Sequence, residues 1–238
     1  LKAILFVDLY GQTPDIDKIK EFAKKFNLKV IEDAAQSFGS SYKDKKVGSL
    51  VDLTCFSFNP VKNLGAMGDA GAVTGDKELV DKVRMYRDHG RRTKFEYETV
   101  GYNARIDNLQ AVVVQAKLQK IDQWLAKKRK ICQRYTEKLK DVVITPKEAS
   151  WSYHTYYVYV IEVPKETRDA LQIFLKDKGI ATNIHYKFPT HTTKAFEKYG
   201  QSLPRTEYVC NNILSLPCYH SLPEHHQDYI VDAVKEFY

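Results

Sequence analysis

The sequence predicts an α/β fold, with a mainly parallel sheet in a large domain (residues 1–145) and a smaller α+β domain (residues 146–238). Three observations predict it. A strand, a helix and a second strand follow one another within residues 3–32, the order of a βαβ unit. The first of these strands is continuously apolar, as in a parallel strand covered on both faces. After Pro146 the composition changes, and an alternating aromatic and β-branched segment, YYVYVIEV, begins the smaller domain.

Hydrophobic periodicity predicts the elements of the large domain in order. Ile16, Ile19, Phe22, Ala23 and Phe26 recur at helical spacing, which indicates a helix over residues 15–26. A polar loop, GRRTKFEYETVGYNAR, separates a later amphipathic helix from a long helical stretch that we expect to bend near 121–122. The other elements are expected as strands at 3–9, 28–32, 53–58 and 70–74, and as helices at 77–89 and 107–140.

The smaller domain is predicted to mix strands and helices. Its first strand is the YYVYVIEV segment, and TNIHY (residues 182–186) is expected to form a second strand. Helices are expected at 165–178, near 193–199, at 204–213 and at 223–237.

Length and charge bound the class of protein. With 238 residues and 43% apolar content, the chain can bury a full core. Its net charge is +7 and its pI about 9.0. The densest basic run, residues 127–130, lies on a predicted helix without interleaved aromatic residues, so a solvated helix face is favoured. The nucleic-acid-binding alternative rests on net charge alone, whereas a basic surface also suits a phosphorylated substrate.

The cysteines indicate a reducing compartment. Cys55, Cys132, Cys210 and Cys218 show neither a CxxC pattern nor metal-ligand spacing, so we expect reduced thiols, no metal and a cytoplasmic protein. We find no signal peptide and no apolar run of membrane-spanning length, so no membrane partner is expected. The chain starts with Leu1, not Met, and its first residues are already expected to form a strand, from which we expect that the amino-terminal part of the large domain is missing.

The segment from residue 30 to 71 carries the chemistry. Asp33 ends one strand, Ser57 ends the next, and Lys62 follows in an apolar, Gly-rich setting. The carboxyl ends of parallel strands are where ligands collect. A pyridoxal phosphate (PLP) site needs a carboxylate against the ring nitrogen, hydroxyl and N–H groups on the phosphate, and an amine for the covalent link. This segment supplies the carboxylate and the amine.

Each of these residues also has an ordinary structural interpretation. Lys62 alone is a weak signal, since loop lysines are common. Asp33 is also typical of a helix N-cap or a strand end. Gln36, which could donate to the phenolic oxygen of the ring, is otherwise a surface amide, and Ser57 is otherwise a buried strand serine bonded to backbone.

Taken together, these residues carry a family resemblance. The sequence EDAAQSFGSSYKDKKVGSLVDLTCFSFNPVKNLGAMGDAGAV resembles the core signature of the DegT/DnrJ/EryC1/StrS family of PLP-dependent nucleotide-sugar aminotransferases. DLYGQTPDIDKIKEFAKKFNLKVIEDAAQ, GYNARIDNLQAVVVQAKL, NIHYKFPTH and LSLPCY are similar to further family segments, so the resemblance covers nearly the whole chain.

The resemblance implies a fold and an activity. The fold would be type I of the PLP-dependent transferases. The reaction would move an amino group from an amino acid, glutamate, to a keto-sugar nucleotide, for amino-sugar and cell-surface glycan (lipopolysaccharide) biosynthesis. A subgroup of the family has histidine in place of the lysine and performs dehydration, and Lys62 argues against that subgroup.

The resemblance also implies site roles. Lys62 would bind PLP and move protons, Asp33 would bind the ring nitrogen, Gln36 the phenolic oxygen and Ser57 the phosphate. Asn103 would reach the phosphate in the neighbouring subunit, which makes the protein a homodimer with shared active sites.

Substrate contacts are implied at three further positions. His185 and Tyr186 would approach the substrate, with simple packing as the alternative. Arg91, with Arg92 and Lys94, would meet the diphosphate, with a solvated basic loop as the alternative.

Two departures from the family pattern matter. The family's chains are longer at the amino end, where a phosphate-binding loop and a ring-stacking aromatic residue normally lie, so we expect an incomplete phosphate site and exposed apolar surface. Asn59 and Val61 stand where an aromatic and a small residue are more usual. The alternative is therefore a non-catalytic fold-type I subunit or fragment unable to hold PLP.

Overall fold

The computed structural model describes residues 1–238, which divide into two compact units. The first unit comprises Leu1–Ala126 and Glu148–Tyr157, and the second comprises Lys127–Lys147 and Val158–Tyr238. These units reflect packing, so the domain boundary expected at residue 145 stays a prediction. No helix is both long and apolar enough to cross a lipid bilayer.

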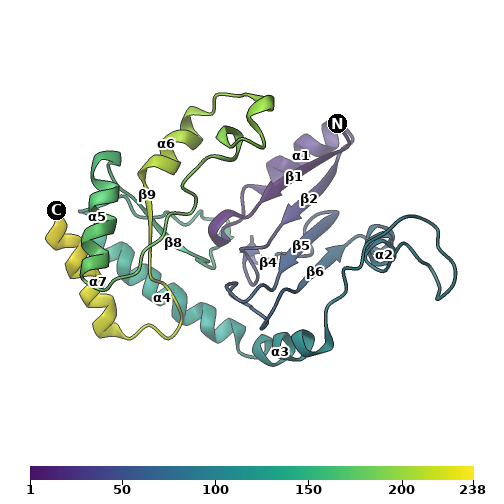
Figure 1. The fold of residues 1–238 in the computed structure, drawn as a ribbon, viewed down its shortest axis with the longest axis horizontal. Coiled ribbons are helices and arrows are strands. Elements are labelled where there is room, and N and C mark those ends of the chain that lie inside the picture. The colour runs from purple at the N-terminus through teal and green to yellow at the C-terminus, as the bar shows by residue number, and fades with distance from the viewer. The chain divides into compact units, whose positions relative to one another are not determined.

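A four-stranded sheet forms the centre of the first unit, with its strands side by side in the order β1-β2-β5-β6 (Figure 1). The first three strands are parallel and β6 runs antiparallel to β5, so the sheet is mainly parallel as expected. A small antiparallel sheet has the order β4-β3-β7. The strands of this unit are β1 (Ala3–Val7), β2 (Lys29–Asp33), β3 (Ser41–Tyr42), β4 (Lys45–Lys46), β5 (Leu53–Ser57), β6 (Gly71–Gly75) and β7 (Ser152–Tyr153).

The register of the parallel strands brings their carboxyl ends together. Val7 pairs with Asp33 across β1 and β2, and Asp33 pairs with Cys55 across β2 and β5. Asp8 continues the ladder past β1, because its N–H donates to the Asp33 carbonyl at 3.1 Å. The residues that follow these strands therefore share one edge of the sheet.

Two helices of the first unit begin at side-chain caps. The helix α1 (Ile16–Lys25) starts at Asp15, whose carboxylate accepts from the Lys18 N–H, and α2 (Lys77–Tyr86) starts in the same way at Asp76. A cluster of buried side chains packs β5 and the segment after it against the start of α4 (Ile121–Leu139). Its buried members are Phe58, Leu64, Ala66, Ile121 and Leu125.

Part of the predicted apolar burial is not found. Leu5 and Val7 of β1 are 63% and 43% exposed, so this strand is not covered on both faces as its continuous apolar run predicted. On α1, Phe22 and Phe26 are each 52% exposed and pack against one another with their rings tilted, instead of entering the core. These surfaces agree with the expectation of exposed apolar area on this sheet.

The long helical stretch is broken close to the expected bend. The helix α3 (Asn108–Leu118) ends at Gln119, and α4 begins at Ile121. The Lys120 N–H still donates to the Lys117 carbonyl at 2.9 Å, which is a tighter i→i−3 turn in place of continuous α-helix.

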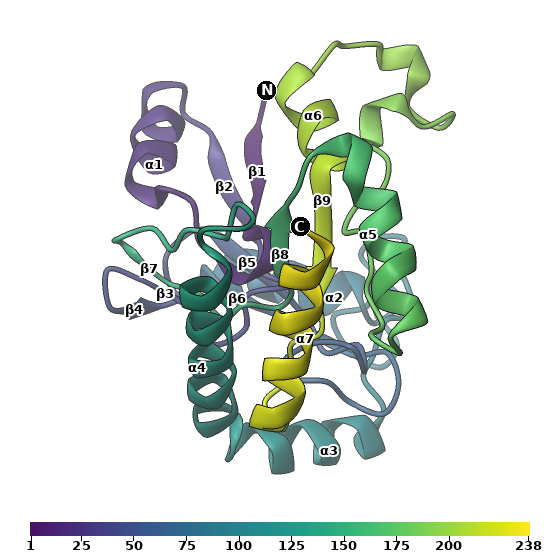
Figure 2. The same ribbon diagram turned by 90° about the vertical axis from the view of Figure 1, so that its left-hand side faces the viewer.

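In the second unit, helices surround an antiparallel pair of strands. The helices α5 and α7 lie side by side (Figure 2), and Phe174 packs on Phe237 between them. The elements are β8 (Tyr159–Glu162), β9 (Ile213–Leu216), α5 (Lys165–Asp177), α6 (Pro204–Asn212) and α7 (Glu224–Phe237), with 3-10 turns at Thr190–Thr192 and Glu197–Tyr199.

The prediction of one strand in the second unit, at residues 182–186, is wrong. Residues 182–186 form only a single bridge, in which Asn183 exchanges two backbone hydrogen bonds with Ser215 of β9. The chain then leaves the strand direction at Ile184, whose N–H donates to the Asn183 side chain at 2.8 Å. This local side-chain bond competes with continued pairing.

Candidate active site

The carboxyl edge of the main sheet holds two of the predicted residues. Asp33 ends β2, and one of its carboxylate oxygens accepts from the Ala35 N–H at 3.0 Å. Gln36 is buried, and its side-chain oxygen accepts from the Tyr10 N–H at 2.6 Å. The turn after β2 thus fixes both side chains, and the amide of Gln36 is anchored to the turn after β1.

The loop that carries Lys62 is shaped by Asn59. The Asn59 carbonyl accepts from the Lys62 N–H at 2.9 Å, and its side-chain oxygen accepts from the Val61 N–H at 3.2 Å. Its amide donates to Asp69 at 2.7 Å, which ties the two ends of the loop together. The Ser57 hydroxyl accepts from the Asn59 N–H at 3.3 Å, so Ser57 also faces this turn. An Asx turn of this kind is a typical role for asparagine.

Side chains of α3 hold the far side of the same loop. The Lys117 ammonium donates to the Gly65 carbonyl at 2.5 Å, and the Gln110 side chain accepts from the Met67 N–H at 2.9 Å. Gly65 has no room for a side chain, since a Cβ there would lie 2.5 Å from the Pro60 carbonyl oxygen. The position of the lysine is therefore set by backbone contacts on both sides.

The Lys62 amine is half-buried, lies over an aromatic ring and is within electrostatic reach of a carboxylate. Its Nζ is 4.6 Å from the centre of the Tyr157 ring. Burial lowers the pKa of Lys62 below its usual value, and the charge of Asp33 opposes that change. A lowered pKa is what a lysine needs in order to act as a nucleophile and a base near neutral pH.

Tyr157 reaches the lysine because its segment crosses the turn after β1. Its N–H donates to the Tyr10 carbonyl at 2.7 Å, and the Thr155 N–H donates to the Gly11 carbonyl at 2.9 Å. Gly11, at φ +99°, permits this close approach, since a Cβ there would lie 2.4 Å from the Thr155 hydroxyl. The sequence prediction missed Tyr157 because its alternating segment is typical of a strand, whereas the strand begins only at Tyr159.

The contact with Tyr157 gives a testable prediction about the amine. Replacing Tyr157 with leucine removes the cation–π stabilisation of the ammonium, which is worth about 0.5–1 kcal/mol. The pKa of Lys62 should fall further, and acetylation of Lys62 at neutral pH should become about two- to fivefold faster. Mass spectrometry of the acetylated peptides measures this, with the exposed Lys82 as the internal reference. Tyr157→Phe keeps the ring and should react like the parent; equal acceleration in both variants would contradict the assignment.

Two buried carboxyl groups lie beside the site. The Asp8 carboxyl accepts from the Ser37 hydroxyl at 2.7 Å, and Glu32 accepts from the Thr54 hydroxyl at 2.8 Å. The other oxygen of each, Asp8 Oδ1 and Glu32 Oε1, has no hydrogen-bond partner. The two carboxyl groups are close enough to act on one another's pKa. Burial raises the pKa of Asp8 to about 8 and raises that of Glu32 as well. The sequence prediction missed this pair because neither residue type signals burial.

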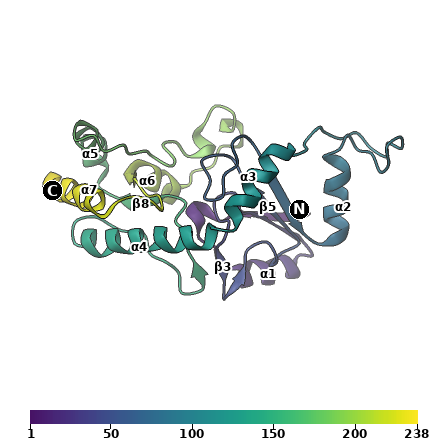
Figure 3. The ribbon, with the colours of Figure 1, turned by 90° about the horizontal axis from the view of Figure 1, so that it is seen from below.

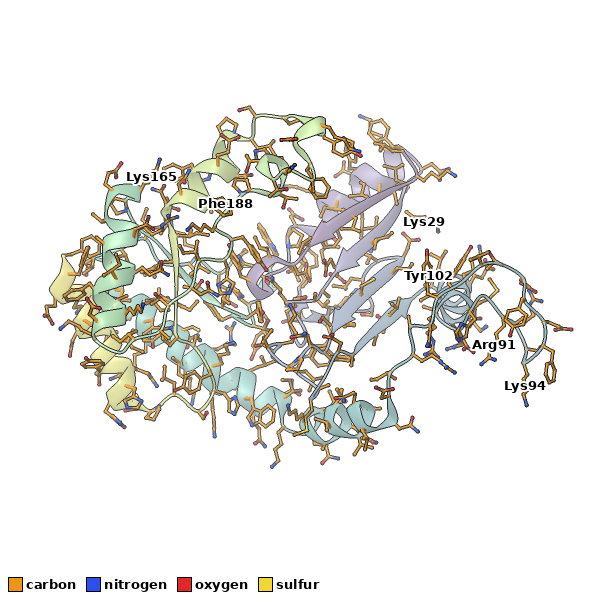
Figure 4. All side chains as sticks on the ribbon, in the orientation of Figure 1. Lys29, Arg91, Lys94, Tyr102, Lys165 and Phe188 are labelled. Carbon is orange, nitrogen blue, oxygen red and sulfur yellow. The ribbon has the colours of Figure 1, made fainter.

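The remaining large-domain predictions lie on the loop after α2 (Figure 4). Arg91 donates to both carboxylate oxygens of Asp88, at 2.8 and 3.1 Å, so its guanidinium is already paired. Lys94 lies at the exposed end of the loop. Asn103 is exposed and forms a single bridge with Asp88. The structure does not bring Asn103 or Arg91 against Lys62, and their roles stay predictions.

His185 and Tyr186 belong to the second unit, so the structure does not test their approach to the substrate. The Nδ1 of His185 lies 2.8 Å from the Ser215 hydroxyl, and its Nε2 lies 3.3 Å from the Asn183 amide. Burial lowers the pKa of His185, which favours a neutral ring at pH 7. Tyr186 is 49% exposed.

The side chains at this edge fit PLP in two of the three respects that the cofactor requires. Lys62 offers a half-buried amine with a lowered pKa, and Asp33 offers a carboxylate close enough to act on that amine electrostatically. Ser57 adds one hydroxyl for the phosphate.

A protein-family model matches nearly the whole chain. The model of the DegT/DnrJ/EryC1/StrS aminotransferase family matches residues 1–235. The chain belongs to this family. Its fold is accordingly fold type I of the PLP-dependent transferases, as the sequence predicted.

Some relatives in this family carry the names of regulatory proteins, and others carry the names of enzymes. The chain is 43% identical over 245 residues to a "Pleiotropic regulatory protein" of Geobacillus stearothermophilus, covering 100% of the chain and 65% of that protein. It is 36% identical over 242 residues to a "dTDP-3-amino-3,4,6-trideoxy-alpha-D-glucose transaminase" of Streptomyces venezuelae, covering 99% and 63%. The chain thus spans just under two thirds of the length of these relatives.

Solved structures of the family superpose closely. A DegT/DnrJ/EryC1/StrS aminotransferase from Brucella abortus is 35% identical with a TM-score of 0.95, covering 99% of the chain and 64% of that protein. NtdA of Bacillus subtilis, solved with the bound cofactor PMP, is 30% identical with a TM-score of 0.91, covering 99% and 56%.

Proposed function

We propose that this chain carries the lysine-bearing part of a PLP-dependent aminotransferase that moves an amino group from glutamate to a keto-sugar nucleotide. The observation that carries the proposal is the half-buried Lys62 amine, whose lowered pKa and proximity to Asp33 suit covalent attachment of PLP. The transaminase name of the Streptomyces venezuelae relative and the PMP bound in NtdA support it.

Each residue has a role that follows from its chemistry. When bound, PLP supplies an electron sink for the negative charge that develops on the substrate carbon. Lys62 Nζ would hold the cofactor, take the proton from the carbon of the amino donor and, in the second half of the reaction, deliver a proton to the carbon that receives the amine. The Asp33 carboxylate keeps the ring nitrogen protonated, Gln36 orients the phenolic oxygen and Ser57 donates to the phosphate.

The partners and the location complete the proposal. The protein would be a homodimer in which Asn103 serves the site of the neighbouring subunit, and Arg91, His185 and Tyr186 would contact the sugar nucleotide. The expected role of the product is in amino-sugar and cell-surface glycan synthesis. A cytoplasmic location is proposed with these partners, supported by four cysteines that form no disulfide.

Borohydride trapping tests the attachment of PLP to Lys62. The purified chain is mixed with PLP, its visible absorbance is recorded, and borohydride then makes the covalent link permanent. Peptide mapping is expected to find the pyridoxyl group on Lys62 in the parent and in Lys82→Ala. In Lys62→Ala the peptide that contains position 62 should carry no pyridoxyl group. A label spread evenly over exposed lysines would overturn the proposal.

The non-catalytic alternative receives less support. Drift in a subunit that no longer binds PLP would not preserve Lys62, Asp33, Gln36 and Ser57 together. The incomplete phosphate site and the regulatory name of the Geobacillus stearothermophilus relative favour a non-enzymatic role. Trapping of PLP on Lys62 separates the two.

A further inference from the structure

Two cysteine sulfur atoms meet inside the second unit, and neither cysteine has been given a role above. The Sγ atoms of Cys132 and Cys218 lie 3.0 Å apart, although 86 residues separate them in the chain. Cys132 lies on α4 with no exposed surface, and Cys218 follows β9 with part of its surface exposed. Both are free thiols. The sequence alone could not pair them, because distant cysteines carry no spacing signal.

The approach of the two sulfur atoms is fixed by the surrounding packing. The Tyr135 hydroxyl, one turn along α4 from Cys132, donates to the carbonyl of Pro217, which directly precedes Cys218, at 3.1 Å. Arg134 pairs with Asp228 of α7 at 2.7 Å, and Figure 3 shows α7 running beside this part of α4. The helix and the segment after β9 are therefore held together independently of the cysteines.

A buried lysine accompanies the thiols. Lys128 lies one helical turn before Cys132, and it interacts electrostatically with both cysteines. Burial lowers the pKa of Lys128, so that it can accept a proton. The hydrogen bond from Cys132 lowers the pKa of the Cys218 thiol, whereas burial raises the pKa of Cys132.

These differences distinguish the two thiols. Of the two residues, Cys218 is the one that keeps part of its surface exposed, and the hydrogen bond from Cys132 favours its thiolate. The thiolate is the attacking species in thiol–disulfide exchange. Cys132 has no accessible surface, but its sulfur lies against that of Cys218. A first reaction at Cys218 would therefore be followed by internal attack from Cys132.

A metal site is a poorer use of the same atoms. No group of three or more His, Cys, Asp and Glu side chains is arranged to hold a metal ion, so the two sulfur atoms lack the further ligands of a structural zinc site. A dithiol needs no third ligand in order to exchange with a disulfide.

We propose that Cys132 and Cys218 form a thiol–disulfide exchange site whose substrates are small-molecule disulfides. The Cys218 thiolate attacks one sulfur of the external disulfide, RS–SR, which forms a mixed disulfide and releases RS⁻. The Cys132 thiol gives its proton to Lys128 and attacks the Cys218 sulfur, which forms the Cys132–Cys218 disulfide and releases the second RS⁻. Two electrons pass from the cysteine pair to RS–SR, and the two thiol protons end on the two released thiols through Lys128 and water.

Oxidised glutathione is the probe that tests this proposal. The full chain is incubated with it, the remaining thiols are alkylated, and the digest is mapped by mass spectrometry. We expect a peptide pair joined through Cys132 and Cys218, about 2 Da lighter than its reduced parts, while Cys55 and Cys210 are alkylated. Equal glutathionylation of all four cysteines, or no reaction at Cys218, would overturn the proposal.

Single variants test the order of the two steps. In Cys132→Ser the mixed disulfide on Cys218 should persist, because no resolving thiol is present. In Cys218→Ser, Cys132 should stay reduced because it has no exposed surface. Cys210→Ser removes another buried thiol and should form the cross-link as the parent does. Circular dichroism of each variant establishes that it is folded, and rapid glutathionylation of Cys132 in folded Cys218→Ser would contradict the order.

Discussion

Replacing Lys62 with alanine is expected to lower the rate of glutamate-dependent transamination by on the order of 10³-fold. The variant loses both the amine that attaches PLP and the group that moves the proton on the substrate carbon. Its fold should survive, because the loop is held by Asn59, Gln110 and Lys117 and not by the Lys62 side chain. The measurement is 2-oxoglutarate formation with saturating PLP and a keto-sugar nucleotide.

An arginine at the same position separates charge from proton transfer. Lys62→Arg keeps a cation over the Tyr157 ring, but a guanidinium stays protonated at working pH and cannot attack PLP. It should therefore be as inactive as Lys62→Ala, while Lys82→Ala keeps the parent rate. Retention of activity within tenfold in Lys62→Ala would contradict the assigned role of Lys62.

Replacing Asp8 with asparagine is expected to stabilise the first unit at pH 7 by on the order of 2–4 kcal/mol. In the unfolded chain Asp8 ionises with the ordinary aspartate pKa of 3.8, whereas in the folded chain burial raises the pKa to about 8. The folded state therefore binds one proton more than the unfolded state between these two values. The free energy of unfolding of the parent should fall as the pH rises from about 4 to about 8, and then level off.

Asparagine removes this pH dependence without removing the hydrogen bonds. Its oxygen can accept from Ser37 and its amide can donate to Glu32, where the parent needs a proton on Asp8. Urea unfolding between pH 4 and 8 should show a flatter profile for Asp8→Asn. Asp44→Asn, at an exposed turn, should follow the parent profile. A steeper loss of stability with pH in Asp8→Asn would show that the pair does not hold a proton.

The local hydrophobic pattern of the sequence was enough to predict most helices and strands of the first unit. The βαβ order of residues 3–32 depends on periodicity and chain direction, and β1, α1 and β2 follow it. Periodicity failed where tertiary contacts decide. The segment 182–186 has strand composition, yet the Asn183 side chain bonds the following N–H and ends the pairing after one residue. Phe22 and Phe26 keep helical spacing but find no core to enter.

The sequence allowed prediction of those site residues that lie on one continuous segment, residues 30–71. Asp33 and Lys62 are close in sequence and follow adjacent strands, so sheet topology brings them together. Tyr157 comes from a segment 95 positions beyond Lys62 and is placed by the Gly11–Thr155 crossing, which no local pattern encodes. The raised pKa values of Asp8 and Glu32 depend on the burial of both carboxyl groups, which no local pattern encodes either.

The way the lysine loop is held has an evolutionary consequence. Its anchors include main-chain atoms and the side chains of Ser57, Asn59, Asp69, Gln110 and Lys117. The side chain of Val61, in contrast, is 70% exposed and anchors nothing. Substitutions at position 61 should therefore cost little folding free energy and leave the adjacent lysine in place. Natural selection, or a directed library, can therefore vary this position while the neighbouring amine keeps its geometry.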